Sequence, residues 1–222
     1  MKFFSRFWRF LQLFWHLSRT TFQMLYGTWR ISKLPQPVVS IFGGSRLKLD
    51  TPYARKAQQL GIRLIERNIS ILTGGGPGIM EAASCGTQTI EKSKRKGRVM
   101  GIGVASLGEE ANKCADEYFE LEFFFARKWL LTENSVAFVI FPGGFGTLDE
   151  LAGVLTLIQT QNLKRVPVLL IGKEYWQDFI KWIENEPLKH GFIFAEDLEF
   201  FKVTDDLDEA VCWLLGKCDL LN

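Results

Sequence analysis

Histidine is scarce in this chain, with only His16 and His190 among 222 residues. A metal centre built on histidine ligands cannot be assembled from two residues, so we expect no bound metal. A Ser-His-Asp triad is not expected for the same reason. The chemistry therefore has to rest on other side chains, and we expect it to need no cofactor.

Cysteine is also sparse and irregularly spaced. The four cysteines are Cys85, Cys114, Cys212 and Cys218, and none of them forms a Cys-x-x-Cys pair or a framework spacing. Cys85 falls in an apolar helical stretch, where a cysteine usually acts as a small core residue. The pattern predicts free thiols and a protein of a reducing compartment.

Acidic residues are absent from the first 49 positions, which contain eight Lys and Arg. Residues 50–222 contain nineteen Lys and Arg against twenty-five Asp and Glu, so the overall charge of +2 hides an asymmetry. The change in composition falls near Pro35-Gln36-Pro37, and proline marks breaks between structural elements. We therefore predict a basic aromatic extension over residues 1–37 and a domain over residues 38–222.

The extension also lacks a long apolar run, since its uncharged runs reach about ten residues, well short of the roughly 20 that cross a bilayer. Its polar residues recur every three or four positions, which predicts an amphipathic helix with a basic face. No uninterrupted apolar region or cleavage site of a signal peptide follows. Ten aromatic residues lie in it: Phe3, Phe4, Phe7, Trp8, Phe10, Phe14, Trp15, Phe22, Tyr26 and Trp29.

Three interpretations of this predicted helix are open. It can lie in a membrane interface, with residues 1–34 making a peripheral contact. It can pack on the domain or on a partner subunit. It can also be an organellar transit peptide, a class that is rich in Arg and poor in acid but usually richer in Ser.

A glycine-rich turn is the most informative stretch that is present. Residues 136–140 form an apolar run typical of a buried strand, Phe141-Pro-Gly-Gly-Phe-Gly-Thr147 follows, and residues 151–158 predict a helix. Such a turn presents backbone N–H groups at a helix N-terminus, where the dipole favours an anion. Thr147 can add a hydroxyl, and Glu150 follows one turn later. A phosphate-binding loop with a carboxylate beside it indicates chemistry on a nucleotide or a sugar phosphate.

A second turn of the same kind follows the predicted strand 69–72. It reads Thr73-Gly-Gly-Gly-Pro-Gly78, and Pro77 suits the first turn of the helix that begins there. Neither turn is a Walker loop or a complete GxGxxG fingerprint. Each alone could be an ordinary connection, but two in one chain favour a binding site.

Apolar strands alternate with helices along the domain. Strands are predicted at residues 38–42, 69–72, 99–104, 136–141, 166–171 and 200–203, and helices at 53–67, 78–94, 123–134, 151–158, 174–185 and 207–215. This order predicts an α/β fold, a Rossmann-like parallel sheet with helices on both faces. Ligands of such sheets bind beyond the carboxyl ends of the strands, where both glycine-rich turns fall.

Three motifs of the domain occur together: Gly74-Gly-Gly-Pro-Gly-Ile-Met-Glu-Ala-Ala83, Arg127-Lys128 and Pro142-Gly-Gly-Phe-Gly-Thr-Leu-Asp-Glu150. In this combination the chain resembles the Lonely Guy (LOG) family of nucleoside 5′-monophosphate phosphoribohydrolases, often mislabelled lysine decarboxylases. The resemblance covers about residues 38–215. The first motif looks more like the bacterial branch than the plant cytokinin enzymes, so the resemblance implies AMP or another purine monophosphate as substrate.

The resemblance places the family's catalytic residues at Arg127 and Glu150. Glu150 also fits by position, because a carboxylate can stabilise the oxocarbenium-like transition state of N-glycoside cleavage. Arg127 is too basic to donate a proton and would hold base or phosphate, unless it only forms a surface ion pair. Glu81 can bind a ribose hydroxyl or only complement its helix dipole. The expected substrate-binding residues are Gly44, Ser45, Gly75, Gly76, Glu81, Lys128, Gly143, Gly144, Gly146 and Thr147.

The resemblance thus implies an enzyme that releases a free base and ribose 5-phosphate from a purine nucleoside 5′-monophosphate, AMP-like or a cytokinin riboside monophosphate. The alternatives are a non-catalytic nucleotide or molybdenum-cofactor carrier and a membrane-attached scaffold that only binds. A pyridoxal-phosphate decarboxylase is rejected, because no lysine at either loop is placed for a Schiff base. We expect a cytoplasmic homodimer or higher oligomer, peripheral on the inner membrane face if the extension binds lipid.

Nucleic acid is not an expected partner. The most basic run of the domain, residues 92–98, carries no interleaved aromatic residues on which bases could stack. We predict that this run is a solvated helix end.

Overall fold

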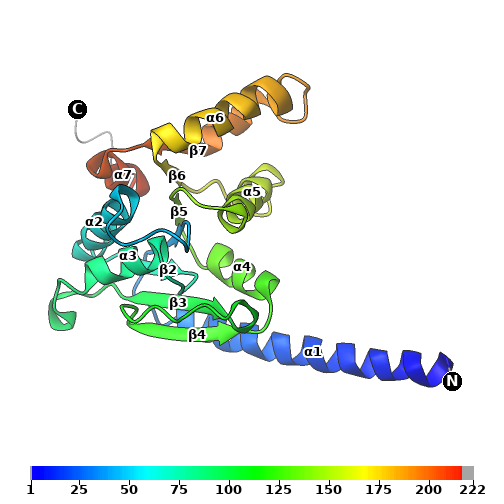
Figure 1. Cartoon of the computed structure of the whole chain (residues 1–222). Helices are drawn as coiled ribbons and strands as arrows, with labels where there is room; N and C mark the ends of the chain where they lie inside the picture. Colours follow the sequence, from blue (N-terminus) through cyan, green and yellow to red (C-terminus); the bar gives the residue numbers. More distant parts are fainter. Residues whose placement is uncertain (1, 217–222) are drawn as a thin grey trace.

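One seven-stranded sheet organises the structure (Figure 1). The computed structural model describes residues 2–216, and of residues 2–5 it describes the backbone alone. All neighbouring strands run parallel, in the order β4-β3-β2-β1-β5-β6-β7. The strands are β1 (Val38–Phe42), β2 (Ser70–Thr73), β3 (Val99–Val104), β4 (Glu117–Leu121), β5 (Ala137–Ile140), β6 (Val168–Ile171) and β7 (Phe201–Thr204). The predicted Rossmann-like α/β fold is confirmed.

Helices cover both faces of this sheet (Figure 1). On one face pack α2 (Pro52–Glu66), α3 (Ile79–Thr87) and α7 (Leu207–Leu214). On the other pack α4 (Phe124–Glu133), α5 (Phe145–Gln159), α6 (Lys173–Ile183) and the end of α1 (Lys2–Ile31). Shorter 3-10 segments occupy Lys92–Lys94, Ala105–Leu107 and Ala195–Phe200, and Glu184–Leu188 is π-helical.

Local sequence explains most of these elements. The strands β1, β2, β3, β5 and β6 are buried at every position, as expected for apolar runs covered on both faces. Helix α2 begins where the Thr51 side chain accepts the backbone N–H of Ala54 at 3.4 Å, with Pro52 in the first turn. Its buried side chains, among them Leu60 and Leu64, then recur at helical spacing.

Two elements differ from the prediction. The strand β4 was not predicted, because its sequence Glu-Tyr-Phe-Glu-Leu is an edge strand with only two buried positions. The helix predicted over residues 78–94 ends at Thr87, and the basic run after it is not wholly solvated. Arg95 turns inward and forms a buried ion pair with Asp116, with nitrogen–oxygen distances of 2.8 and 3.0 Å. An inward ion pair of this kind has no local sequence signature.

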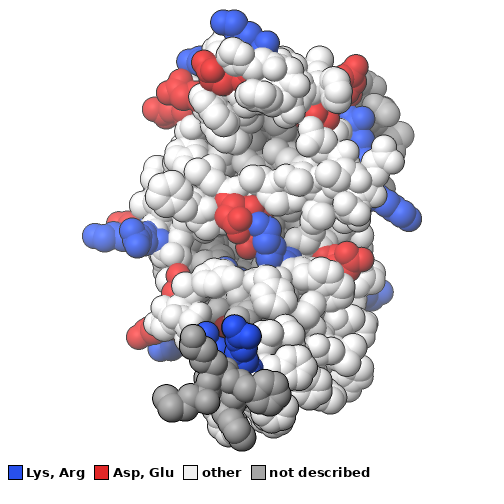
Figure 2. All heavy atoms as spheres, turned by 90° about the vertical axis from the view of Figure 1, so that its right-hand side faces the viewer, with Lys and Arg blue, Asp and Glu red and all other residues white. Residues whose placement is uncertain are grey.

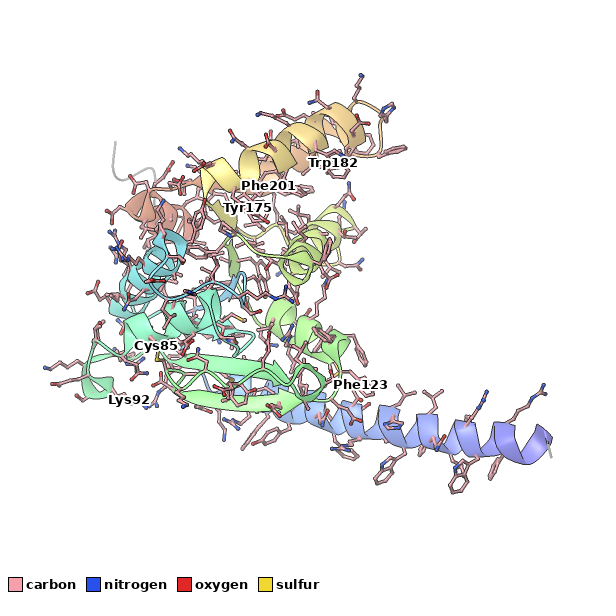
Figure 3. The ribbon with its side chains drawn as sticks, viewed as in Figure 1. Cys85, Lys92, Phe123, Tyr175, Trp182 and Phe201 are labelled. Carbon is pink, nitrogen blue, oxygen red and sulfur yellow. A yellow bond between two sulfur atoms is a disulfide. The ribbon has the colours of Figure 1, made fainter. Side chains whose placement is uncertain are left out.

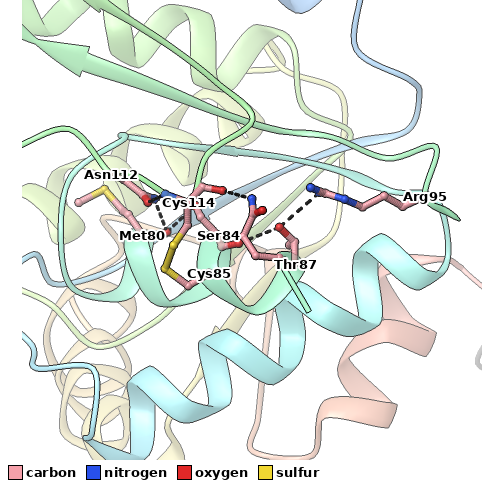
Figure 4. Close-up of a disulfide and its surroundings, with 8 residues drawn as sticks. Met80, Ser84, Cys85, Thr87, Arg95, Asn112 and Cys114 are labelled. Carbon is pink, nitrogen blue, oxygen red and sulfur yellow. Dashed lines mark hydrogen bonds between the residues drawn. A yellow bond between two sulfur atoms is a disulfide. The ribbon is translucent and has the colours of Figure 1, made fainter. Parts of the chain in front are cut away.

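The prediction of free thiols is wrong for two of the cysteines. Cys85 on α3 and Cys114 in the loop before β4 form a disulfide (Figure 4), with their Cα atoms 4.8 Å apart. The loop reaches α3 because Asn112 donates its side-chain amide to Met80 O at 3.2 Å and to Ser84 Oγ at 2.7 Å. The spacing of the cysteines does not predict this bond, because the two residues are 29 positions apart and meet only through the folding of the loop onto α3. Cys212 is free, and Cys218 lies outside the described residues.

The extension forms the helix α1, which projects beyond the sheet at one end of the molecule (Figure 1). Within residues 2–216 no helix is both long and apolar enough to cross a membrane. The predicted boundary at residue 37 falls between the end of α1 and the start of β1. The division into extension and domain stays a prediction.

Candidate active site

Three loops meet at the carboxyl ends of the strands, and Gly44 joins them. Its N–H donates to Pro142 O at 2.9 Å, which ties the loop after β1 to the loop after β5. Its carbonyl accepts the N–H of Ile79 at 3.1 Å, which ties in the loop after β2. Since β1 and β5 are the neighbours at which the strand order reverses, these loops surround the topological switch point of the sheet.

Glycine is required where these loops touch. Gly78 has a φ of +72°, and a Cβ there would collide with the carbonyl oxygen of Gly44. A Cβ on Gly143 would collide with the Thr147 hydroxyl. The glycines of both motifs are therefore needed for the loops to pack closely, in addition to any part they play in binding a ligand.

A cavity of about 630 Å³ opens between the loops, within the size range of small-molecule sites. Its wall combines glycine backbone, the apolar side chains of Phe42, Met80, Leu107, Phe124 and Leu131, and the charged side chains of Arg46, Glu109, Arg127 and Glu150. On the face drawn in Figure 2, acidic and basic side chains lie next to each other beside a central hollow. The cavity wall is therefore mixed in chemistry, with apolar, charged and backbone polar groups side by side.

Glu150 is the most unusual group of this cavity. It lies in α5, is only 7% exposed, and its Oε2 has no hydrogen-bond partner among the described residues. Burial raises its pKa above the ordinary range, while the nearby Lys128 and Arg127 act in the opposite direction. A buried carboxylate with a free oxygen is available for a reaction partner.

Arg127 approaches the same cavity from α4. Its guanidinium lies 4.9 Å from the centre of the Phe124 ring, and its Nε is buried without a hydrogen-bond partner among the described residues. Burial lowers the pKa of Arg127, and the carboxylates Glu150 and Glu109 partly oppose that shift. Arg127 is therefore not the surface ion pair that its sequence position also allowed.

Lys128 points to α5 and not into the cavity. Its Nζ donates to Asp149 O at 2.7 Å and lies 2.9 Å from Asp149 Oδ2. Its side chain passes directly over Gly153, where a Cβ would collide with it. Lys128 thus holds α4 against the turn of α5 that carries Glu150.

The N-terminus of α5 forms the polar floor of the cavity. Gly144 precedes the helix, and Gly146 and Thr147 line the cavity from its first turn. The N–H of Thr147 donates to Gly144 O at 3.0 Å, whereas the N–H groups of Phe145 and Gly146 precede the first helical hydrogen bonds, so this end can bind an anion. The loop before this helix is held in place by α6, because the hydroxyl of Tyr175 (labelled in Figure 3) donates to Gly143 O at 2.6 Å.

The predicted site residues divide into two groups. The residues that line the cavity are Gly44, Ser45, Arg127, Gly144, Gly146, Thr147 and Glu150. The predicted residues that do not line it are Gly75, Gly76, Glu81, Lys128 and Gly143. Gly75, for example, faces the sheet edge, where a Cβ would lie 2.6 Å from the Tyr118 ring. The binding and catalytic roles of both groups stay predictions.

Glu109 was missed by the sequence analysis. It lines the cavity from the loop after β3, and a Cβ on Gly76 would lie 2.6 Å from its Oε2. The only sequence signal was its place just beyond the carboxyl end of a predicted strand. Phe124 and Phe145 also line the cavity and were not predicted, because nothing in the sequence other than their aromatic character marks them.

Fold and cavity together define a Rossmann-like α/β protein with a cavity at the switch point of its sheet. The sequence model of a family described as "Possible lysine decarboxylase" matches residues 80–214, and the chain belongs to this family, the LOG family. Among curated relatives, a cytokinin riboside 5′-monophosphate phosphoribohydrolase of Arabidopsis thaliana, LOG2, is 30% identical over 158 residues, 70% of this chain and 71% of the relative. A second phosphoribohydrolase of that name from the same plant, LOG1, is 31% identical over 159 residues, which make up 70% of this chain and 71% of the relative.

Solved structures share the fold at lower identity. The molybdenum cofactor binding protein of Rippkaea orientalis superposes with a TM-score of 0.62 at 21% identity, over 82% of this chain and 96% of the other. The molybdenum cofactor carrier protein of Chlamydomonas reinhardtii gives a TM-score of 0.57 at 21% identity, over 82% of this chain and all of the other. These likenesses establish the fold alone.

Proposed function

We propose that this protein hydrolyses the N-glycosidic bond of a purine nucleoside 5′-monophosphate, AMP-like or a cytokinin riboside monophosphate, to the free base and ribose 5-phosphate. One observation carries the proposal: Glu150 is a buried carboxylate with an unpartnered oxygen, in the same cavity as a glycine-lined helix N-terminus. The names of the curated relatives support phosphoribohydrolase activity in general.

The N-terminus of α5 would hold the phosphate. The backbone N–H groups of Phe145 and Gly146 and the hydroxyl of Thr147 supply donors there, and the helix dipole favours the negative charge. A phosphate fixed at this end places the ribose toward the second turn of the helix, where Glu150 lies. Binding energy from the phosphate then orients the bond that breaks.

Glu150 would act at the anomeric carbon. As the C1′–N bond breaks, its electron pair moves to the base and positive charge develops on the sugar, which a carboxylate stabilises. A water molecule then bonds to C1′, and Glu150 accepts the proton that this water loses. That proton then passes from Glu150 to the leaving base, so that the sugar gains the hydroxyl of the water, the base gains its proton, and Glu150 is ionised again.

Arg127 would orient the substrate and remain charged throughout. Its unpartnered Nε is free to donate to phosphate or to the base, and the Phe124 ring beneath it offers a flat apolar surface. Glu109, which also lines the cavity, adds an acceptor for ribose or base donors. Glu81, outside the cavity wall, would complement the dipole of α3.

The direct test is a panel of nucleoside 5′-monophosphates incubated with the full-length protein, followed by chromatography for free base. We expect release of base from at least one purine monophosphate and far slower release from the matching nucleoside, which lacks the anchoring phosphate. Tight nucleotide binding without any release would instead support the carrier alternative. A carrier, however, has no need for a buried carboxylate beside a bound phosphate.

We also propose that the protein is a homodimer or a higher assembly. The exposed face of α4 supports the assembly, since Phe124, Phe125 and Trp129 are each 44–55% exposed beside the cavity. Large apolar patches of this kind usually mark interfaces.

A further inference from the structure

The C-terminal half of α1 is fixed to the domain by specific contacts. Arg30 forms an ion pair with Glu117 at 2.7 Å, and the side chain of Gln23 accepts the backbone N–H of Glu122 at 3.1 Å. A Cβ on Gly27 would collide with Leu130 of α4 or crowd the Phe119 ring of β4. These contacts fix the direction in which the rest of the helix projects.

The N-terminal half has no such cover. Every side chain from residue 6 to residue 17 is exposed, and the helix extends past the sheet into open space (Figure 1). His16 still contacts the domain, since its ring lies 6.3 Å from that of Phe123, which is labelled in Figure 3, and its Nδ1 lies 3.4 Å from Glu122 Oε1. A single helix of this composition is not expected to stay in water with its aromatic side chains uncovered.

The two sides of α1 differ along its whole length. Residues seven apart lie on nearly the same side of a helix, and the buried pair Thr20 and Gly27 marks the side that contacts the domain. The row Trp8, Trp15, Phe22 and Trp29 runs along the other side and is 54–73% exposed throughout. This aromatic row is about 32 Å long, and it runs without a break from the projecting N-terminal half of α1 along the C-terminal half that contacts the domain. The apolar side of α1 therefore faces away from the domain from end to end.

The charge of the projecting half points to the same kind of partner. His16 and Arg19 share the acidic Glu122, but Arg6 and Arg9 form no ion pair with any described residue. No acidic residue occurs in the first 49 positions. Pairing two copies through the row from Trp8 to Trp29 would leave the charges of Arg6 and Arg9 uncompensated, whereas an anionic surface would compensate them.

We propose that α1 lies in the interface of an anionic membrane, with the row from Trp8 to Trp29 immersed and Arg6 and Arg9 at the level of the headgroups. Tryptophan is favoured at that depth, and basic residues add attraction to anionic lipid. The domain then stands above the surface, because it is attached to the opposite side of the helix. The free end of α1 projects on the side toward which β3 and β4 point (Figure 1), so the cavity at the strand ends opens along the membrane surface toward water.

Flotation of the full-length protein with vesicles tests this directly. We expect it to float with vesicles that contain phosphatidylserine, to float weakly with pure phosphatidylcholine, and to release at high salt. The double substitution Arg6→Gln/Arg9→Gln should lower the partition coefficient for anionic vesicles by about tenfold or more. The matched control is Arg55→Gln, an exposed arginine of α2, which should change nothing.

The aromatic row has its own test. Trp8→Ser/Trp15→Ser should abolish binding to anionic vesicles, whereas Trp182→Ser, at another exposed tryptophan, on α6 (labelled in Figure 3), should not. The proposal is overturned if the full-length protein ignores anionic vesicles. It is equally overturned if Trp8→Ser/Trp15→Ser changes the mass in light scattering and leaves flotation unaltered, because α1 would then pack on a second copy. Base release plays no part in either readout, so failure of the proposed function is seen separately.

Discussion

Lys128 donates to both the main-chain and the carboxylate oxygen of Asp149, the residue directly before Glu150. A cation on α4 therefore holds the helix that carries the proposed catalytic carboxylate. The same cation lowers the pKa of Glu150 against the stronger effect of burial. Position and ionisation of Glu150 thus depend on one neighbouring side chain.

Replacing Lys128 by Met should shift the acid limb of the activity profile to higher pH. Without the cation the pKa of Glu150 rises further, and a larger fraction of the carboxyl is protonated and inactive at a given pH. The pH dependence of kcat/KM measures this. Lys113→Met, an exposed lysine away from the cavity, serves as control. An unchanged acid limb in Lys128→Met would show that Glu150 is not the titrating group.

Glu150→Gln should lower turnover by roughly a hundredfold or more while nucleotide binding persists, since charge stabilisation in the transition state is lost. Glu133→Gln, an exposed residue at the end of α4, is the matched control. Binding is followed by calorimetry and base release by chromatography. Normal turnover in Glu150→Gln would end the proposed mechanism.

The same substitution should also raise the melting temperature at neutral pH. Because the folded pKa of Glu150 is raised, this group contributes stability below the ordinary pKa of a glutamate, and that contribution is lost as the pH rises through the raised value. A glutamine does not ionise and avoids the loss. The gain over the native protein should therefore shrink as the pH is lowered, which calorimetric melts at several pH values will measure.

Gly78→Ala should destabilise the fold by about 1–3 kcal/mol and weaken the site, because the new Cβ meets the Gly44 carbonyl at a positive φ. Gly108→Ala provides a matched comparison, since its φ is +59° but nothing lies within 4 Å of the added Cβ. Denaturant unfolding of both variants separates backbone strain from collision. Equal losses in the two would mean that contact with Gly44 adds nothing.

Reduction of the disulfide between Cys85 and Cys114 should lower the free energy of unfolding by about 3–4 kcal/mol, given a sequence separation of 29 residues. Unfolding curves with and without reductant measure the difference. Cys85→Ser should be as unstable as the reduced native protein and insensitive to reductant. Cys212→Ser, at a free cysteine, should keep the full response to reductant.

Phe125→Ser/Trp129→Ser should reduce the molecular mass seen by light scattering at micromolar concentration, because α4 loses the exposed apolar side chains proposed to join two copies. Phe192→Ser, an exposed aromatic far along the chain, should leave the mass unchanged. A native protein that is already monomeric would contradict the proposed assembly.

The sequence predicted those parts of the fold whose signals are local. The apolar run before Phe141, the glycines after it and the helix beyond are contiguous, so the strand, the turn and the position of Glu150 followed from neighbouring residues alone. The strand β4, the inward turn of Arg95 to Asp116 and the bond between Cys85 and Cys114 all join segments far apart in the chain. Their signals are long-range contacts, which periodicity and composition do not contain.

The same distinction between local signals and long-range contacts applies to the candidate site. Arg127 and Glu150 were identified from motifs, but the direction of the Lys128 side chain depends on the space that Gly153 leaves on the next helix. Glu109 enters the cavity because its loop is anchored on α3 through Asn112. Neither could be predicted without the packing of one element on another.

The proposed reacting pair comes from one continuous α-β-α unit, since Arg127 on α4 and Glu150 on α5 flank the single strand β5. The remaining cavity wall is contributed by separate loops after β1, β2 and β3. Substitutions in those loops can alter the shape offered to the base without touching the segment that carries the pair. The same chemical centre can thus be inherited intact while selectivity for the base diverges around it.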